Sequence, residues 1–111
     1  MVNLGTRNVE TTQRVIIISK KVDCFETALS KALMITVLKE KMSKGIVHFL
    51  YQKIDGSIRE AFGTTHRIIV ESKTTGNGTS PERRNMTAYF DVEKGQWRCF
   101  KWENFIGILN S

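Results

Sequence analysis

The chain has 111 residues, of which 41% are hydrophobic and 25% charged, and this is the composition of one ordinary globular domain. Seventeen Lys and Arg against eleven Asp and Glu give a formal net charge of +6. That balance is consistent with a polyanionic ligand such as nucleic acid, and equally with a soluble domain that has a basic surface. No apolar run approaches the ~20 residues of a membrane helix, so we expect a cytoplasmic protein with no membrane contact.

The stretch from residue 6 to residue 20 is ambiguous. Its β-branched run Val15-Ile-Ile-Ile18 could face inward from a helix or form a strand. We favour a helix, because the strands predicted further along complete a sheet without it.

A second helix is predicted over residues 24–43. Asp23 and Glu26 have the spacing of a capping box, and Gly45 is a typical residue just after a helix C-terminus. Apolar and small residues recur near helical spacing and are expected to pack in the core: Phe25, Ala28, Leu29, Ala32, Leu33, Thr36, Leu38 and Met42.

After Gly45 the apolar period changes to two, which is typical of strands. Asp55-Gly56 is a strong signal for a two-residue turn, so residues 46–53 and 57–63 are predicted to pair as a hairpin. The remaining expected elements are a segment compatible with a short strand (67–70), a loop (72–85), a strand (86–91), a turn (93–95), a strand (96–101), one helical turn (102–104) and a last strand (105–109).

Five short strands, tight hairpins and a single helical turn before the last strand describe an SH3-like or Sm-like small β-barrel. The predicted fold class is therefore α+β. An N-terminal helical segment (1–44) precedes a five-stranded barrel (45–111), which hides its sheet edges by curling closed.

The residues that usually ligate metals or act as nucleophiles show no chemical pattern. Cys24 and Cys99 lie far apart and outside any CxxC spacing, and His48 and His66 add no metal-ligand spacing. No glycine-rich phosphate loop is present. We therefore expect reduced cysteines, no cofactor and no enzymatic activity.

Two stretches carry a resemblance to a known family. They are GIVHFLYQKIDGSIREAFGT (45–64) and YFDVEKGQWRCFKWENFI (89–106). Together they resemble the small WYL-related family, which is described as an Sm-like SH3 β-barrel and occurs in Bacteroidales genomes and their phages. The similarity covers about residues 25–109.

The better-known WYL domains are similar more distantly. They sit in bacterial transcription regulators and are thought to sense nucleic-acid or nucleotide ligands. Tyr89-Phe90 and the segment from Arg98 to Lys101 stand at places comparable to an aromatic strand and an Arg-x-Phe-Arg-like strand of those domains, with Lys101 where a second Arg is common. The resemblance thus implies ligand sensing.

The candidate ligand-binding residues are basic or aromatic: Arg59, Arg83, Arg84, Tyr89, Arg98 and Lys101. Arg98 beside Arg59 and a tyrosine would form an anion site, because guanidinium groups bind phosphate in two-pronged fashion and aromatic rings stack on bases. The alternative is that Arg98 pairs with Asp91 or Glu93 within its own hairpin. Arg98 and Lys101 have opposite parity along the strand, so they are expected on opposite faces unless a bulge intervenes.

We predict a non-enzymatic small-barrel protein that binds nucleic acid or a nucleotide-like anion in a regulatory role. The alternative is an interaction module encoded by a phage or mobile element, which would act in the host cytoplasm. Sm-like barrels form rings by pairing edge strands, so this module would assemble into homo-oligomers or bind a protein partner. The first function predicts salt-dependent binding of a polyanion that is lost on Arg98→Ala. The second predicts a stable oligomer that is indifferent to nucleic acid.

Overall fold

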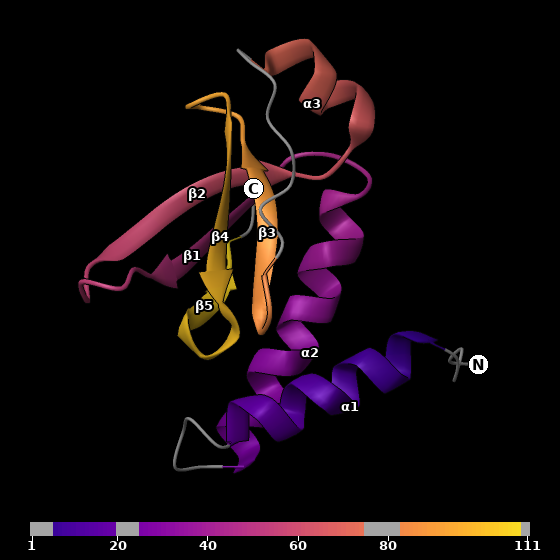
Figure 1. The fold of residues 1–111 in the computed structure, drawn as a ribbon, viewed down its shortest axis with the longest axis vertical. Helices are drawn as coiled ribbons and strands as arrows, with labels where there is room; N and C mark the ends of the chain where they lie inside the picture. The colour runs from indigo at the N-terminus through magenta and orange to yellow at the C-terminus, as the bar shows by residue number, and fades with distance from the viewer. Residues whose placement is uncertain (1–5, 20–24, 75–82, 110–111) are drawn as a thin grey trace.

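The computed structural model describes residues 6–19, 25–74 and 83–109 (Figure 1). Its helices are α1 (Thr6–Ser19), α2 (Phe25–Met42) and α3 (Arg67–Lys73), with one 3₁₀ turn, η1 (Trp102–Asn104). Its strands are β1 (Val47–Gln52), β2 (Ile58–Thr64), β3 (Met86–Asp91), β4 (Gln96–Lys101) and β5 (Phe105–Ile108). The predicted N-terminal helices, both hairpins, the helical turn and the last strand are confirmed.

The strands form one antiparallel sheet in the order β4-β3-β2-β1-β5. The β1–β5 register shifts between Leu50 and Tyr51, and such an irregularity increases local bending and twist. The strands at the two ends of this order, β4 and β5, follow one another in the chain through η1. Helix α2 runs along the sheet and α1 crosses α2 near its N-terminal end (Figure 1). The predicted α+β arrangement of helices followed by a five-stranded sheet is confirmed.

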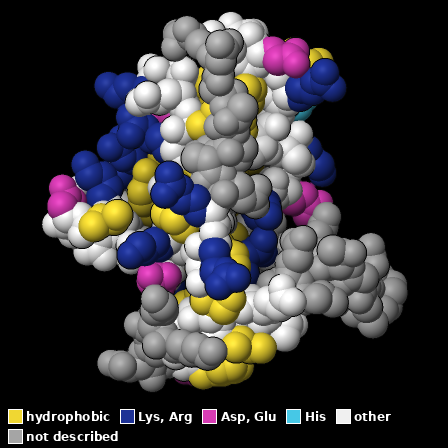
Figure 2. Space-filling view, viewed as in Figure 1, with side chains coloured by type: hydrophobic (Ala, Val, Ile, Leu, Met, Phe, Trp, Pro, Cys, Tyr) yellow, Lys and Arg dark blue, Asp and Glu magenta, His cyan; other side chains and the backbone are white. Residues whose placement is uncertain are grey.

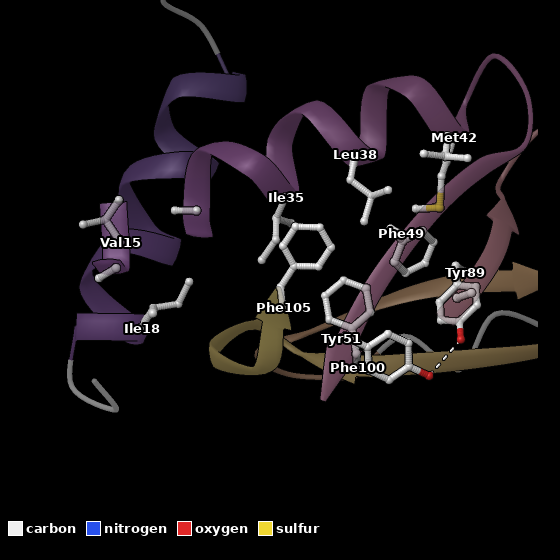
Figure 3. Close-up of a cluster of buried hydrophobic side chains, with 14 residues drawn as sticks. Val15, Ile18, Ile35, Leu38, Met42, Phe49, Tyr51, Tyr89, Phe100 and Phe105 are labelled. Atoms are coloured by element: carbon white, nitrogen blue, oxygen red, sulfur yellow. Dashed lines mark hydrogen bonds between the residues drawn. The ribbon is translucent and has the colours of Figure 1, made fainter. Parts of the chain in front are cut away.

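The core lies between α2 and the inner face of the sheet (Figure 3). Burial of apolar area drives the packing there. Its aromatic part is a cluster of five rings, each at most 5% exposed: Phe49, Tyr51, Tyr89, Phe100 and Phe105. Neighbouring rings in this aromatic cluster have centroids 5.0 to 6.3 Å apart. The sheet backbone approaches the cluster closely at Gly63, where an added Cβ would lie 2.6 Å from Cδ2 of Tyr89.

Residues 67–70 begin helix α3, so the expectation of a short strand there is wrong. The Thr64 hydroxyl oxygen accepts the backbone N–H of His66 at 3.0 Å, and the Val70 N–H donates to the His66 carbonyl at 3.0 Å. Arg67 Nε and Glu71 Oε2 then pair at 3.0 Å one turn apart. None of the residues of α3 is buried, so its β-branched side chains have no sheet surface on which a strand would pack.

The apolar stripe predicted for α2 is only partly core. One set of its side chains is fully buried: Ala28, Ala32, Leu38 and Met42. A second set is exposed to 63%, 38%, 50% and 45% and is spaced four residues apart: Phe25, Leu29, Leu33 and Val37. We call this second set the exposed row of α2. The expectation that the whole predicted stripe packs in the core is wrong for Phe25, Leu29 and Leu33, because α2 presents its other side to the sheet. Val37 lies in the exposed row but was not part of the predicted stripe.

Several sequence predictions fall outside the described residues. They concern the Asp23 cap, the thiol of Cys24, and residues 75–82 of the predicted loop. Within the described part of the chain, no helix has the length and apolar character needed to cross a membrane. The division of the chain at residue 44 stays a prediction.

Candidate anion-binding groove

Strand pairing places two candidate arginines on the inner face of the sheet. Arg59 on β2 lies opposite Tyr51 on β1, and Arg98 on β4 lies opposite Tyr89 on β3. Residues directly opposite each other in an antiparallel pair point to the same face. Both tyrosines belong to the aromatic cluster, so both arginines stand on the face that carries the core.

A groove of about 570 Å³ opens between the β1–β2 hairpin and β4. Its charged lining residues are four basic and one acidic: Lys53, Arg59, Arg98, Lys101 and Asp55. Its other lining residues are Tyr51, Gln52, Ile54, Met86, Trp97, Cys99, Phe100 and Asn104. Figure 2 shows Lys and Arg side chains gathered around apolar ones over the region of β2 and β4. The groove therefore combines an apolar lining with a basic rim.

Asp91, the last residue of β3, binds Arg98. Arg98 Nε donates to Asp91 Oδ2 at 2.9 Å, and the Asp91 side chain is only 6% exposed. The second oxygen, Oδ1, accepts the backbone N–H groups of Glu93 and Lys94 at 2.9 and 3.1 Å. The alternative interpretation that Arg98 pairs within its own hairpin is thus confirmed for Asp91. The arginine nevertheless lines the groove, so the ion pair does not remove it from the candidate site.

The hydroxyl groups of Tyr51 and Tyr89 form a buried pair 2.8 Å apart (Figure 3). Burial raises the pKa of Tyr51, and the bond to Tyr89 and the charges of Arg59 and Arg98 lower it only in part. Burial also raises the pKa of Tyr89 above the ordinary 10.0, and its hydrogen bond to Tyr51 raises it further. Both tyrosines are therefore neutral at physiological pH, and the positive charge of the groove comes from its Lys and Arg side chains.

Arg98 and Lys101 point to opposite faces of β4, as their parity predicted. Arg98 pairs with Tyr89 on the inner face, whereas Lys101 pairs with Met86 on the outer face. Both still line the same groove, because β4 is at the edge of the sheet and the groove extends along that edge. Three of the six candidate residues are thereby brought together: Arg59, Arg98 and Lys101.

The other three candidates are placed differently. Arg83 and Arg84 are exposed in the segment before β3 and do not line the groove. Tyr89 is fully buried, so its ring is closed to a stacked base and its hydroxyl is bound to Tyr51. Tyr89 therefore supports the groove from beneath rather than contacting a ligand.

Lys53 and Trp97 line the groove and are not among the six candidate residues. Lys53 follows β1 directly, and its position two residues before the Asp55-Gly56 turn placed it on the same hairpin as Arg59. Trp97 packs edge-on against Phe90, with ring centroids 5.6 Å apart. The β1–β2 hairpin and β4 line one groove because the sheet curves, and no local sequence pattern predicts that curvature.

The carboxylates near the groove have structural partners. Asp55 Oδ1 accepts the backbone N–H and the hydroxyl of Ser57 at 3.0 and 2.7 Å, and these bonds lower its pKa. Asp91 is bound to Arg98 and to the turn that follows β3. Among the residues that the structure describes, no group of three or more His, Cys, Asp or Glu side chains could hold a metal ion. The arrangement is suited to electrostatic recognition of an anion.

Comparison with known proteins gives a family match and a phage relative. The family model described as WYL_2, Sm-like SH3 beta-barrel fold, matches residues 35–106. An uncharacterized 11.5 kDa protein of the Gp31-cd intergenic region of Enterobacteria phage T4 is 33% identical over 85 residues, which cover 74% of this chain and 83% of the phage protein. No solved structure matches the chain. The Sm-like barrel prediction is thereby confirmed, and the Bacteroidales source stays a prediction.

Proposed function

Because the chain belongs to the WYL_2 family of Sm-like SH3 β-barrels, we propose that it is a non-enzymatic binding protein that takes a nucleic acid or nucleotide in its basic groove. The observation that carries this proposal is the groove lining, which sets four basic side chains against one acidic one. The proposal includes a regulatory role, in which ligand binding at the groove is the signal.

Charge and geometry favour phosphate as the group that is bound. Arg59 and Arg98 come from different strands and both line the groove, so two guanidinium groups face one space. Guanidinium groups form charge-assisted, two-pronged hydrogen bonds with phosphate oxygens. Lys53 and Lys101 extend the positive surface along the groove, which suits a ligand with more than one phosphate.

The aromatic lining contributes less to ligand contact than the charges do. Tyr51 and Phe100 are 5% and 2% exposed, so their faces are already covered by the core. Trp97 is half-buried against Phe90. A stacked base gains little from rings that present so small a surface. We therefore expect recognition to depend on phosphates more than on base identity.

The test of the proposal is Arg98→Ala. We expect the wild type to bind labelled single-stranded and double-stranded DNA and RNA in fluorescence anisotropy, with affinity that falls between low and moderate salt. Loss of charge-assisted hydrogen bonds to one phosphate should raise the Kd by about tenfold to a hundredfold in Arg98→Ala.

Lys94→Ala is the matched control for Arg98→Ala. It removes one positive charge from the exposed turn between β3 and β4, outside the groove lining. Its Kd should rise by about twofold or less, because an exposed charge away from the ligand is screened by salt. Absence of wild-type binding at low salt, or equal losses in both variants, would contradict the proposed function.

A second candidate function, assembly of copies of this chain, is favoured by the exposed row of α2. Its four large apolar side chains, at intervals of four residues, form a ridge on the solvent-exposed side of the helix. Two such ridges can pack against each other about a two-fold axis. Antiparallel pairing would bring Glu26, in the first turn of one α2, toward the basic last turn of the other, which carries Lys39 and Lys41. We propose a second copy as the occupant of this face.

Assembly is tested by light scattering after size exclusion. We expect the wild type to elute as a dimer at high micromolar concentration and the double variant Leu29→Ser with Leu33→Ser as a monomer, because apolar area at the helix contact is replaced by hydroxyl groups. Arg98→Ala should remain a dimer. A wild-type monomer at that concentration rules out the second candidate.

A further inference from the structure

Asp91 holds its carboxylate in one orientation through three hydrogen bonds. Oδ1 accepts the N–H groups of Glu93 and Lys94, and Oδ2 accepts Nε–H of Arg98 at 2.9 Å. The two backbone donors belong to a turn that is closed further by the Gly95 N–H, which donates to the Asp91 carbonyl at 2.8 Å. Asp91 as a whole residue is 4% exposed, so its carboxylate is not free to rotate toward solvent.

This arrangement determines which part of Arg98 can meet a ligand. The guanidinium group has five N–H donors in a planar fork, and Asp91 takes the one on Nε. Among the described residues, Asp91 is the one carboxylate that pairs with Arg98. The two amino groups, Nη1 and Nη2, are therefore left at the end of a side chain whose plane is already fixed. That end is an edge of the guanidinium plane that can bind two phosphate oxygens at once.

We propose that Asp91 is a positioning residue, which fixes the guanidinium group of Arg98 so that both amino groups face a phosphate in the groove. This inference rests on the proposed function. Asp91 itself carries a negative charge, which is unfavourable in an anion site. Its role can therefore be tested by whether its neutralisation strengthens or weakens anion binding. If Asp91 acted only through its charge, its neutralisation would tighten anion binding. If it positions Arg98, neutralisation weakens binding, because the side chain must then be ordered by the ligand.

Asp91→Asn separates these two effects with little change to the turn. The amide oxygen can still accept the backbone N–H groups of Glu93 and Lys94, whereas the amide NH₂ cannot accept from Arg98 Nε. With a labelled single-stranded DNA oligonucleotide as the probe, we expect the Kd to rise by about twofold to tenfold. In the Arg98→Ala background there is no guanidinium group to position and only the charge effect remains, so the same substitution should leave the Kd unchanged or lower it.

The outcomes distinguish this inference from the proposed function. If the wild type binds and Arg98→Ala weakens binding, but Asp91→Asn binds equally or more tightly, only the positioning role is overturned. An equal loss from Asp91→Asn in both backgrounds also overturns it, because the effect then bypasses Arg98. A wild type that binds no oligonucleotide defeats the proposed function and this inference with it.

Arg98→Lys provides a second measurement that leaves residue 91 unsubstituted. Lysine keeps the positive charge but lacks the planar fork that Asp91 orients. If the fixed fork is what binds phosphate, Arg98→Lys should lose nearly as much affinity as Arg98→Ala. Wild-type affinity in Arg98→Lys would overturn the positioning role, even if Asp91→Asn did not fold.

Discussion

Phe49→Ala is expected to lower the free energy of unfolding by about 3–5 kcal/mol, the range for removing a fully buried aromatic ring. Phe49 contacts four other rings of the aromatic cluster, and its centroid lies 5.0 Å from that of Tyr89 in an edge-to-face arrangement. The side chain stands between α2 and the sheet (Figure 3), where the close-packed neighbouring elements can move only partly into the space that it leaves. Urea unfolding followed by circular dichroism measures the change.

Phe25→Ala deletes the same atoms from an exposed position and is the matched control. Phe25 is 63% exposed at the start of α2, so its removal should change the stability of the monomer by about 0.5 kcal/mol or less. The comparison should be made at protein concentrations at which the chain is monomeric. Similar losses in the two variants would mean that Phe49 is not at the centre of the core.

The elements that could be predicted from the sequence are those with local causes. Asp55-Gly56 predicted the first hairpin, and the structure shows Gly56 at φ 92° and the Asp55 carboxylate bonded within the turn. The failures have tertiary causes. Residues 67–70 have strand-like side chains, but no residue of α3 is buried against the sheet. The exposed row of α2 has helical spacing but no surface of the fold against it.

In the candidate site, too, the features with local causes could be predicted and those with tertiary causes could not. The pairing of Arg98 with Asp91 could be foreseen, because the two residues belong to one hairpin whose turn sets the register. That Lys53 and Lys101 line one groove could not be foreseen, because it depends on how far the sheet curls between the first hairpin and β4. Nor could the burial of Tyr89, since either parity of β3 was open until the aromatic cluster was seen to occupy the inner face.

The stability of the fold should fall steeply above pH 10. The chain contains two tyrosines, and burial raises the pKa of both above the ordinary 10.0. In the unfolded chain they ionise near pH 10, whereas in the folded chain they keep their protons. Their contribution is therefore fully present below pH 10 and is lost as the pH rises toward the folded pKa values. Above pH 10, each tyrosine lowers the free energy of unfolding by at most about 1.4 kcal/mol per pH unit.

Tyrosinate absorbance tests this directly, because the two tyrosines that ionise are the two whose hydroxyls pair 2.8 Å apart. We expect no tyrosinate signal from the native protein through pH 10, and a signal for both residues in urea at the same pH. At higher pH the signal should appear together with loss of secondary structure, because burial disfavours the ionised hydroxyls in the folded chain. The double variant Tyr51→Phe with Tyr89→Phe isolates the effect, since its stability should lack the tyrosine-dependent fall with pH. Reversible ionisation near pH 10 with the secondary structure intact would contradict the buried hydroxyl pair beneath the groove.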